Sequence, residues 1–181
     1  MMWIYFIKYK SKAFECFKNL KALIKNEKDS KIKCLRTDRG GGFTSKEFDE
    51  FCKEHGIERE LSTTRTPQQN GVVERRNRTI QEMARTMLLA VDLQPKFWRE
   101  AVGTTVYTLN QTQLRPNNEK TPYELWKGRP TSVKYFRVFG RKCFIKINDD
   151  SPGKFDSRVD KGIFLGYSTR SKAYKCYNNR L

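Results

Sequence analysis

The chain has 181 residues, of which 37 are Lys or Arg and 20 are Asp or Glu, and this gives a formal net charge of +17. Such a balance is typical of nucleic-acid-binding proteins and of other basic soluble proteins, and an aromatic content of 13% argues against intrinsic disorder. Five widely spaced cysteines and one histidine exclude a disulfide framework and a zinc motif, and the apolar start is too short for a membrane span or a secretory signal.

The first predicted elements are a strand and an amphipathic helix. Residues 3–9 are aromatic and β-branched and predict a buried strand. Ser11 follows as the expected N-cap of a helix with Phe14 and Phe17 on one face and lysines on the other. These lysines are typical of a solvated face, and a specific DNA contact is the alternative.

Asp38 lies at the end of the next predicted strand, over residues 31–38, and glycines follow it closely. Ser45 predicts the start of a second helix and Gly56 its end, and residues 57–62 alternate as a third strand. Strands and helices in this order are typical of an α/β fold with crossover connections. Ligands of such folds bind outside the strand ends, where Asp38 is expected.

A long helix over residues 72–90 is predicted after the turn signal at Asn70, because apolar residues recur there at helical spacing. Glu74 falls in the first turn of this helix. A carboxylate at that position can simply complement the helix dipole. The arginines beside it are candidates for contacts to DNA phosphate, and they are Arg75, Arg76 and Arg78.

Asp38 and Glu74 together suggest a metal site. An acid at a strand end and another on a helix that packs over the sheet can meet at a divalent cation, since magnesium prefers oxygen ligands such as carboxylates. Metal sites of this kind serve phosphodiester chemistry, in which the ions activate the attacking oxygen and stabilise the leaving one. We therefore predict that these two carboxylates share a metal ion.

The second half of the chain changes in character after residue 110. Helix is expected around Phe97 and over residues 102–109, as part of the core. Residues 111–133 are polar and rich in turn signals, and they predict a linker. Short apolar runs separated by Gly, Pro and Asp then predict a small β-sheet or barrel, with strands over 136–139, 143–147 and 162–167.

Two of these motifs carry a family resemblance: Leu35-Arg-Thr-Asp38-Arg-Gly-Gly and Pro67-Gln-Gln-Asn-Gly-Val-Val-Glu74-Arg-Arg-Asn-Arg. They resemble the integrase core of copia-type LTR retrotransposons, a part of the Pol polyprotein and a member of the RNase H-like Asp-Asp-Glu recombinases. The resemblance extends through Thr121-Pro-Tyr-Glu-Leu-Trp-Lys-Gly and Gly162-Ile-Phe-Leu-Gly-Tyr, and so covers nearly the whole chain.

The resemblance implies an α/β fold, with an RNase H-like integrase core that lacks its first strand over residues 1–110, a linker over 111–133 and a small β-barrel-like module over 134–181. It implies metal-dependent DNA strand transfer, with Asp38 and Glu74 as catalytic ligands for magnesium or manganese. The expected partners are element ends and target DNA, which the three arginines help to bind, and a homo-oligomer is left open. We expect no membrane partner and a nuclear or cytoplasmic location.

The chain departs from the family pattern at its start. The family site needs a third acid on a strand that precedes residues 3–9, and the acids before Asp38 lie elsewhere. We therefore expect a truncated copy that holds metal weakly and is inactive by itself, and Met1 need not be the true start. Gly42 also stands where the family has Glu. The alternatives are a non-enzymatic basic remnant that binds nucleic acid and a decayed reading frame whose product does not fold stably.

Overall fold

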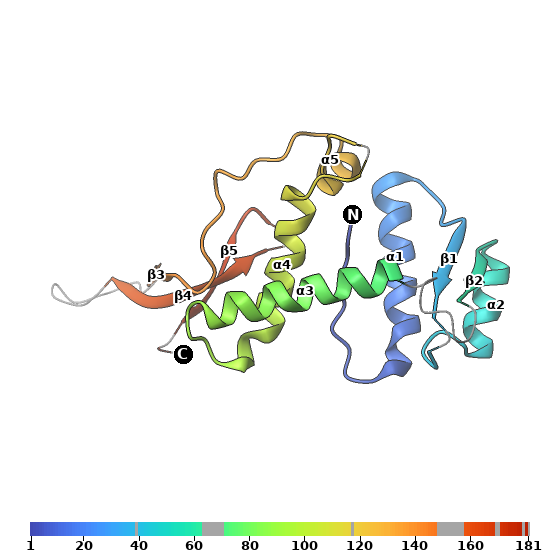
Figure 1. Ribbon diagram of the computed structural model, residues 1–181, viewed down its shortest axis with the longest axis horizontal. Coiled ribbons are helices and arrows are strands. Elements are labelled where there is room, and N and C mark those ends of the chain that lie inside the picture. The colour runs from blue at the N-terminus through green and yellow to red at the C-terminus, as the bar shows by residue number, and fades with distance from the viewer. Residues whose placement is uncertain are drawn as a thin grey trace. The chain divides into compact units, whose positions relative to one another are not determined.

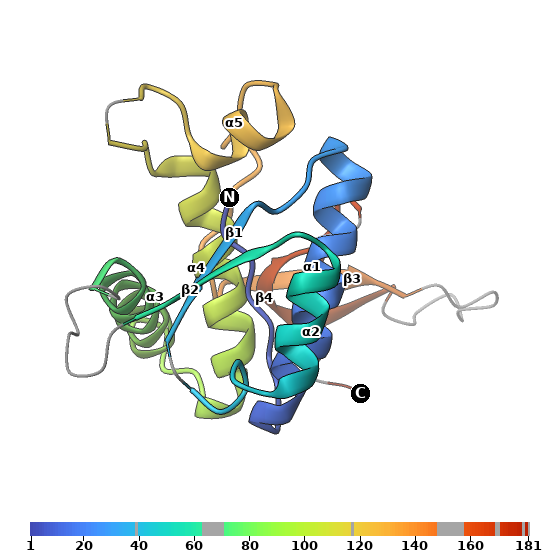
Figure 2. The ribbon, with the colours of Figure 1, turned by 90° about the vertical axis from the view of Figure 1, so that its right-hand side faces the viewer.

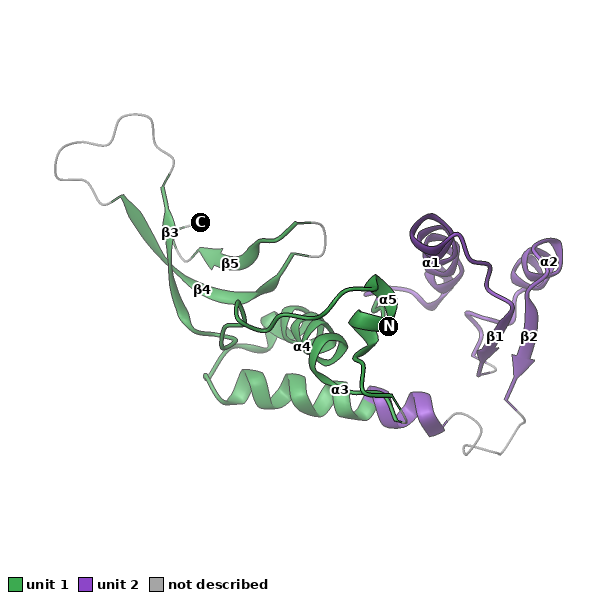
Figure 3. Cartoon of the chain, turned by 90° about the horizontal axis from the view of Figure 1, so that it is seen from above, with its two compact units in different colours: residues 1–4, 78–181 green, residues 5–77 purple. Residues whose placement is uncertain are grey.

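The computed structural model describes residues 1–38, 40–62, 71–116, 118–147, 158–168, 171–178 and 180 (Figure 1). The chain folds as two compact units (Figure 3). The N-terminal unit is Tyr5–Asn77, and the C-terminal unit is Met1–Ile4 with Arg78–Leu181. Helix α3 (Gly71–Leu89) belongs to both. The domain boundaries expected near residues 110 and 133 stay a prediction.

The N-terminal unit is built on a two-stranded parallel sheet. Its elements are η1 (Lys10–Lys12), α1 (Ala13–Lys28), β1 (Cys34–Thr37), α2 (Lys46–Glu54), β2 (Glu58–Leu61) and the first turns of α3. The strands pair in register from Cys34 opposite Glu58 to Thr37 opposite Leu61, and α2 makes the crossover between them. Helices α1 and α2 lie on the same side of this pair of strands (Figures 2 and 3). The predicted crossover pattern is thus confirmed.

Aromatic side chains of α1 and α2 form the core of the N-terminal unit. Phe48 is fully buried, and its ring centroid lies 5.0 Å from that of Phe14 and 5.2 Å from that of Phe17. Cys52 and Ile57 are the other buried members of the cluster. Because both helices meet at these rings, the cluster determines how α1 and α2 are held over β1 and β2.

The strand predicted over residues 3–9 is wrong, because this segment is irregular up to η1. Its apolar side chains are partly exposed, with Ile4 at 38% and Ile7 at 42%. A strand needs a hydrogen-bonded neighbour, and within the described residues the sheet of the N-terminal unit consists of β1 and β2. Residues 3–9 therefore stay irregular despite their β propensity, because no described strand pairs with them.

The two predicted helix starts have opposite outcomes. Ser11 lies inside η1, and α1 begins at Ala13 without a side-chain cap, so that prediction is wrong. Ser45 does cap α2, since its Oγ accepts the Phe48 N–H at 3.2 Å. The end predicted for α2 is also confirmed, because Gly56 follows it with a φ of 63°.

The C-terminal unit combines helices with a three-stranded antiparallel sheet. Its elements after α3 are η3 (Pro95–Phe97), α4 (Trp98–Thr112), α5 (Pro122–Lys127), β3 (Lys142–Lys146), β4 (Val159–Tyr167) and β5 (Tyr174–Asn178). The strands lie in the order β3-β4-β5, so β4 is central. The long helix and the strands expected over 143–147 and 162–167 are confirmed. None of the helices in the described ranges combines the length and apolar character needed to cross a membrane.

The strand predicted over residues 136–139 is wrong, and β5 was not predicted. Phe139 buries its side chain in the core, and the chain turns at Gly140, which has a φ of 78° and donates its N–H to Phe164 O at 2.8 Å. The apolar run therefore anchors a turn. Strand β5 escaped prediction because most of its residues are exposed and show no alternation.

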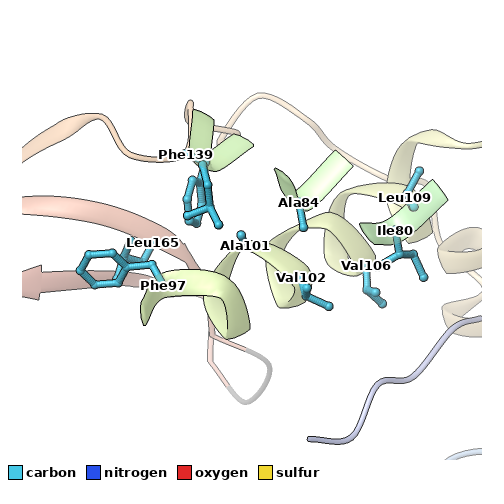
Figure 4. Packing of buried hydrophobic residues seen from close by; sticks show 10 residues of the cluster. Ile80, Ala84, Phe97, Ala101, Val102, Val106, Leu109, Phe139 and Leu165 are labelled. Carbon is cyan, nitrogen blue, oxygen red and sulfur yellow. The ribbon is translucent and has the colours of Figure 1, made fainter. Parts of the chain in front are cut away.

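Helices α3 and α4 and strand β4 share the core of the C-terminal unit (Figure 4). Ile80, Ala84 and Leu88 recur every four residues on α3, and all are buried. Thr104 of α4 is also buried and donates its hydroxyl to Leu165 O of β4 at 3.0 Å. The remaining buried residues of the cluster are Phe97, Ala101, Val102, Val106, Leu109, Phe139 and Leu165.

Candidate active site

Asp38 is positioned by the strand before it. Strand β1 ends at Thr37, whose side chain is buried, and the exposed Asp38 is the next residue. Its Oδ1 accepts the backbone N–H of Gly40 at 3.0 Å, in the local turn that Asp favours. A Cβ at residue 40 would lie 2.9 Å from the same oxygen, so a larger residue there would crowd it. The sequence Asp-Arg-Gly therefore holds the carboxylate just beyond the strand end.

A cross-strand ion pair lies two residues before Asp38. Arg36 of β1 stands opposite Glu60 of β2, and its Nε donates to Glu60 Oε2 at 2.7 Å. The Arg36 guanidinium holds the pKa of Glu60 below its usual value, chiefly through this hydrogen bond. The positive charge nearest to Asp38 on β1 is thus already engaged by a carboxylate.

Glu74 and the three arginines lie in the first two turns of α3. Glu74, Arg75 and Arg78 are exposed, and Arg76 is half-buried. Residues four apart on a helix are neighbours on its surface, so Arg78 follows Glu74 on one face. The predicted helical position of Glu74 is confirmed, whereas Pro67 and the rest of 63–70 lie outside the described residues.

The convergence of Asp38 and Glu74 on one cation stays a prediction, because residues 63–70, which join β2 to α3, lie outside the described residues. The two side chains have the right chemistry for such an ion, since both are exposed and magnesium prefers carboxylate oxygens as ligands. In the part of the chain that the structure describes, no three side chains of His, Cys, Asp or Glu gather as a metal-binding group. DNA contacts by the arginines stay a prediction as well.

Arg59 holds the loop after Asp38 in place, and sequence reasoning missed this role. Its side chain, 11% exposed, donates to Asp49 Oδ1 on α2 and to Phe43 O in the loop. The guanidinium also lies 5.0 Å from the centroid of the Phe48 ring. The sequence signal for this role was an arginine on the core-facing side of a short strand. A buried guanidinium needs hydrogen-bond or ion-pair partners, so such an arginine indicates that it holds neighbouring segments together.

The chain is similar over nearly its whole length to transposon polyproteins. It is 37% identical over 177 residues to "Retrovirus-related Pol polyprotein from transposon TNT 1-94" of Nicotiana tabacum, which is 98% of this chain and 13% of that protein. It is 30% identical over 174 residues to the corresponding polyprotein from transposon RE1 of Arabidopsis thaliana, which is 96% of this chain and 12% of that protein. The chain is homologous to one segment of the retrovirus-related Pol polyproteins of transposons. This Pol segment spans about an eighth of the length of these relatives.

Two family models match parts of the Pol segment. The retroviral polymerase SH3-like domain matches residues 141–181, which include β3, β4 and β5. The TnsB C-terminal domain matches residues 17–88, which include both Asp38 and Glu74. The two candidate ligands therefore lie within one matched region.

One solved structure shows the fold of the chain. A chain of the simian T-cell lymphotropic virus intasome, in complex with PP2A regulatory subunit B56 gamma, matches 97% of the Pol segment with a TM-score of 0.53 and 16% identity, over 64% of that chain. The HTLV-2 integrase catalytic core domain in complex with magnesium matches 64% of the segment and 70% of that chain, with 26% identity and a TM-score of 0.47. The predicted fold class, an RNase H-like integrase core followed by a small β-rich part, is confirmed.

Proposed function

We propose that this Pol segment is an integrase fragment that binds DNA and supplies two catalytic carboxylates for metal-dependent DNA strand transfer. The observation that carries the proposal is the position of Asp38 at the end of β1 and of Glu74 in the first turn of α3, in a chain with an integrase-type fold. A net charge of +17 supports a polyanionic partner. Element ends and target DNA are the proposed substrates.

Asp38 and Glu74 are the residues that would hold magnesium or manganese. The bound ion would supply activation of the attacking hydroxyl and stabilisation of the leaving oxygen. The Gly40 N–H restrains Asp38 at 3.0 Å, which limits the motion of the carboxylate before any ligand binds. Arg78, one turn after Glu74, is placed to contact a backbone phosphate through its guanidinium.

A strand-transfer assay tests the two acids. We expect no activity from the 181 residues alone, and activity in a fusion that adds an Asp-bearing first strand from a related polyprotein. In that fusion Asp38→Asn and Glu74→Gln should each lower the rate about 100-fold or more, since metal-ion stabilisation is worth several kcal/mol and each 1.36 kcal/mol is a factor of ten.

Two exposed acids nearby provide matched controls. Asp29 follows α1, and Glu82 lies two turns after Glu74 on α3. Asp29→Asn and Glu82→Gln remove the same charge without touching the proposed ligands, so the rate should stay unchanged. Equal rates for Asp38→Asn and Asp29→Asn would refute the metal role, provided that circular dichroism shows both variants folded.

A second candidate function is a non-enzymatic binder of nucleic acid, which the net charge of +17 favours. It predicts DNA binding that ignores sequence, weakens steeply with salt and is unchanged by Glu74→Gln. Arg78→Gln should reduce the slope of log affinity against log salt by about one if Arg78 contacts a phosphate. Binding that does not respond to salt would contradict this alternative.

A further inference from the structure

Strand β3 exposes an aromatic ring at the edge of the three-stranded sheet. Its residues alternate, with Cys143 and Ile145 half-buried and Lys142, Phe144 and Lys146 exposed. Phe144 leaves 73% of its surface exposed. The outward face of this edge strand therefore consists of one aromatic ring between two lysines.

The neighbouring strand adds a third lysine to the same face. Lys161 of β4 stands directly opposite Phe144, and Val159, which is 45% exposed, stands opposite Lys146. Opposite residues of paired strands project from the same face of a sheet, as do residues two apart on one strand, about 6.8 Å from each other. We call this surface the Phe144 face, and its residues are Lys142, Phe144, Lys146, Val159 and Lys161.

Each part of this arrangement has an ordinary explanation. Lysines on an edge strand discourage pairing with another chain, and single apolar side chains are common on protein surfaces. Neither accounts for the combination, because a polar residue at 144 would protect the edge without exposing a ring. The other phenylalanine of the described strands, Phe164, is 4% exposed, so this sheet does bury a phenylalanine where it serves packing.

A ring bordered by cations matches a ligand that is flat and apolar in one part and anionic in the next. A nucleotide of a single strand has both parts, since its base can stack on an aromatic side chain while its phosphates contact lysines. In a duplex the bases are stacked on each other, and mainly their edges and the phosphates are accessible. We propose that the Phe144 face binds an unpaired nucleotide, with the base on the Phe144 ring and the adjacent phosphates on the three lysines.

This site goes beyond the strand-transfer proposal and does not depend on it. All its residues belong to the C-terminal unit, and the contacts that it uses need no metal ion. A chain without any catalytic activity would still bind a single strand there. Equilibrium binding without magnesium therefore tests it separately.

Fluorescence anisotropy of a labelled 15-residue oligothymidine and of a duplex of the same length is the decisive measurement. Phe144→Leu keeps an apolar side chain but removes the ring, and it should weaken single-strand binding about 5- to 150-fold, the equivalent of ~1–3 kcal/mol per stacked base. Duplex affinity should stay unchanged. Phe144→Trp retains a stacking surface and should preserve single-strand binding, whereas Lys161→Gln should weaken both ligands.

Val138→Ala is the matched control, because Val138 is 66% exposed and lies outside the Phe144 face. The proposal is overturned if Phe144→Leu and Val138→Ala bind the single strand equally, or if Phe144→Leu weakens the duplex as much as the single strand. Photocrosslinking of the unaltered chain to 5-iodouracil in the oligonucleotide keeps the test valid if a variant folds poorly. The crosslink should map to the tryptic peptide 143–146, and a crosslink confined to other peptides would also overturn the proposal.

Discussion

The two units differ in how far the described residues complete their sheets. In the C-terminal unit a three-stranded antiparallel sheet packs on α4 through its central strand β4, and the core cluster contains ten buried residues. In the N-terminal unit two parallel strands of four residues each support a cluster of four buried residues. Parallel sheets are ordinarily covered on both faces, and a small core contributes little net stability, so we expect the N-terminal unit to be the less stable of the two.

This difference matters because Asp38 lies in the unit that we expect to be less stable. Its position depends on β1, on the Gly40 hydrogen bond and on the loop that Arg59 holds at Phe43 O. The strand, the hydrogen bond and the loop all belong to the N-terminal unit, whose core is the small cluster around Phe48. Regions with few buried apolar contacts open at lower free energy than a well-packed core. We therefore expect the candidate metal ligand to be lost by local opening before α4 unfolds.

The largest effect should come from Phe48→Ala. Phe48 is fully buried, and its replacement by alanine should lower the free energy of unfolding of the N-terminal unit by about 3–5 kcal/mol. Hydrogen exchange read by mass spectrometry should accelerate in peptides from α1 and α2 while peptides from α4 stay protected. Loss of protection in α4 to the same extent would show that the units unfold together and would remove the distinction between them.

The converse variant is Gly166→Ala in the C-terminal unit. Gly166 has a φ of 137°, and a Cβ there would collide with Thr104 Oγ1, so we expect about 1–3 kcal/mol of destabilisation from strain and overpacking. Exchange should accelerate in β4 and α4 and stay unchanged in α2. Gly103→Ala is the matched control, because a Cβ at that helical position meets nothing within 4 Å, and it should be neutral or slightly stabilising.

Asn110→Ala should have a smaller and more local effect. The buried side chain of Asn110 donates from Nδ2 to Met2 O at 2.9 Å and accepts the Met2 N–H at 2.8 Å, which ties residues 1–4 to α4. Loss of both bonds should cost about 1–3 kcal/mol. Backbone amides of residues 2–4 should then exchange faster, with Asn110→Asp intermediate because it keeps only the acceptor. Unchanged exchange at residues 2–4 would show that the contact of Trp3 with Trp126 suffices.

Local chemistry in the sequence was enough to predict the helices. The residues Ile80, Met83, Ala84, Met87 and Leu88 pack on the core at a spacing of three and four residues, which is typical of one helix face and not of a strand. The Ser45 cap acts through a hydrogen bond three residues away. The position of Asp38 after a strand was predictable for the same reason, because β1 and the Asp-x-Gly turn are both local features. Glu74 follows from the helix pattern.

Features that depend on a distant partner were beyond the sequence. Residues 3–9 and 136–139 have strand-like composition, yet a strand forms only where another strand pairs with it. Asn110 reads as an ordinary polar helix residue until its partner at Met2 is known. The exposure of Phe144 likewise depends on the place of β3 at the edge of the sheet, where Phe144 stands opposite the exposed Lys161. The predicted meeting of Asp38 and Glu74 at one cation also depends on distant parts of the chain, and it stays a prediction.

The smallest expected effect concerns the pKa of one carboxyl group in each unit, Glu60 in the N-terminal unit and Glu124 in the C-terminal unit. The Arg36 guanidinium lowers the pKa of Glu60 in the N-terminal unit, and the backbone N–H groups of Thr121 and Thr131 lower the pKa of Glu124 in the C-terminal unit. Each lowered pKa contributes stability above the unfolded value near 4.5, and that contribution is lost as the pH falls through the folded value.

Salt distinguishes the ion pair that lowers the pKa of Glu60 from the backbone hydrogen bonds that lower the pKa of Glu124. The side chains of Arg36 and Glu60 are 64% and 42% exposed, so about 1 M salt, with a Debye length of ~3 Å, should screen much of their attraction. Hydrogen bonds from backbone N–H groups to Glu124, at 2.8 and 3.1 Å, persist under the same conditions. In an NMR titration the pKa of Glu60 should therefore rise toward its usual value in high salt while that of Glu124 stays low. Arg36→Gln should raise the pKa of Glu60 already in low salt, and equal salt shifts at both groups would contradict the assignment of causes.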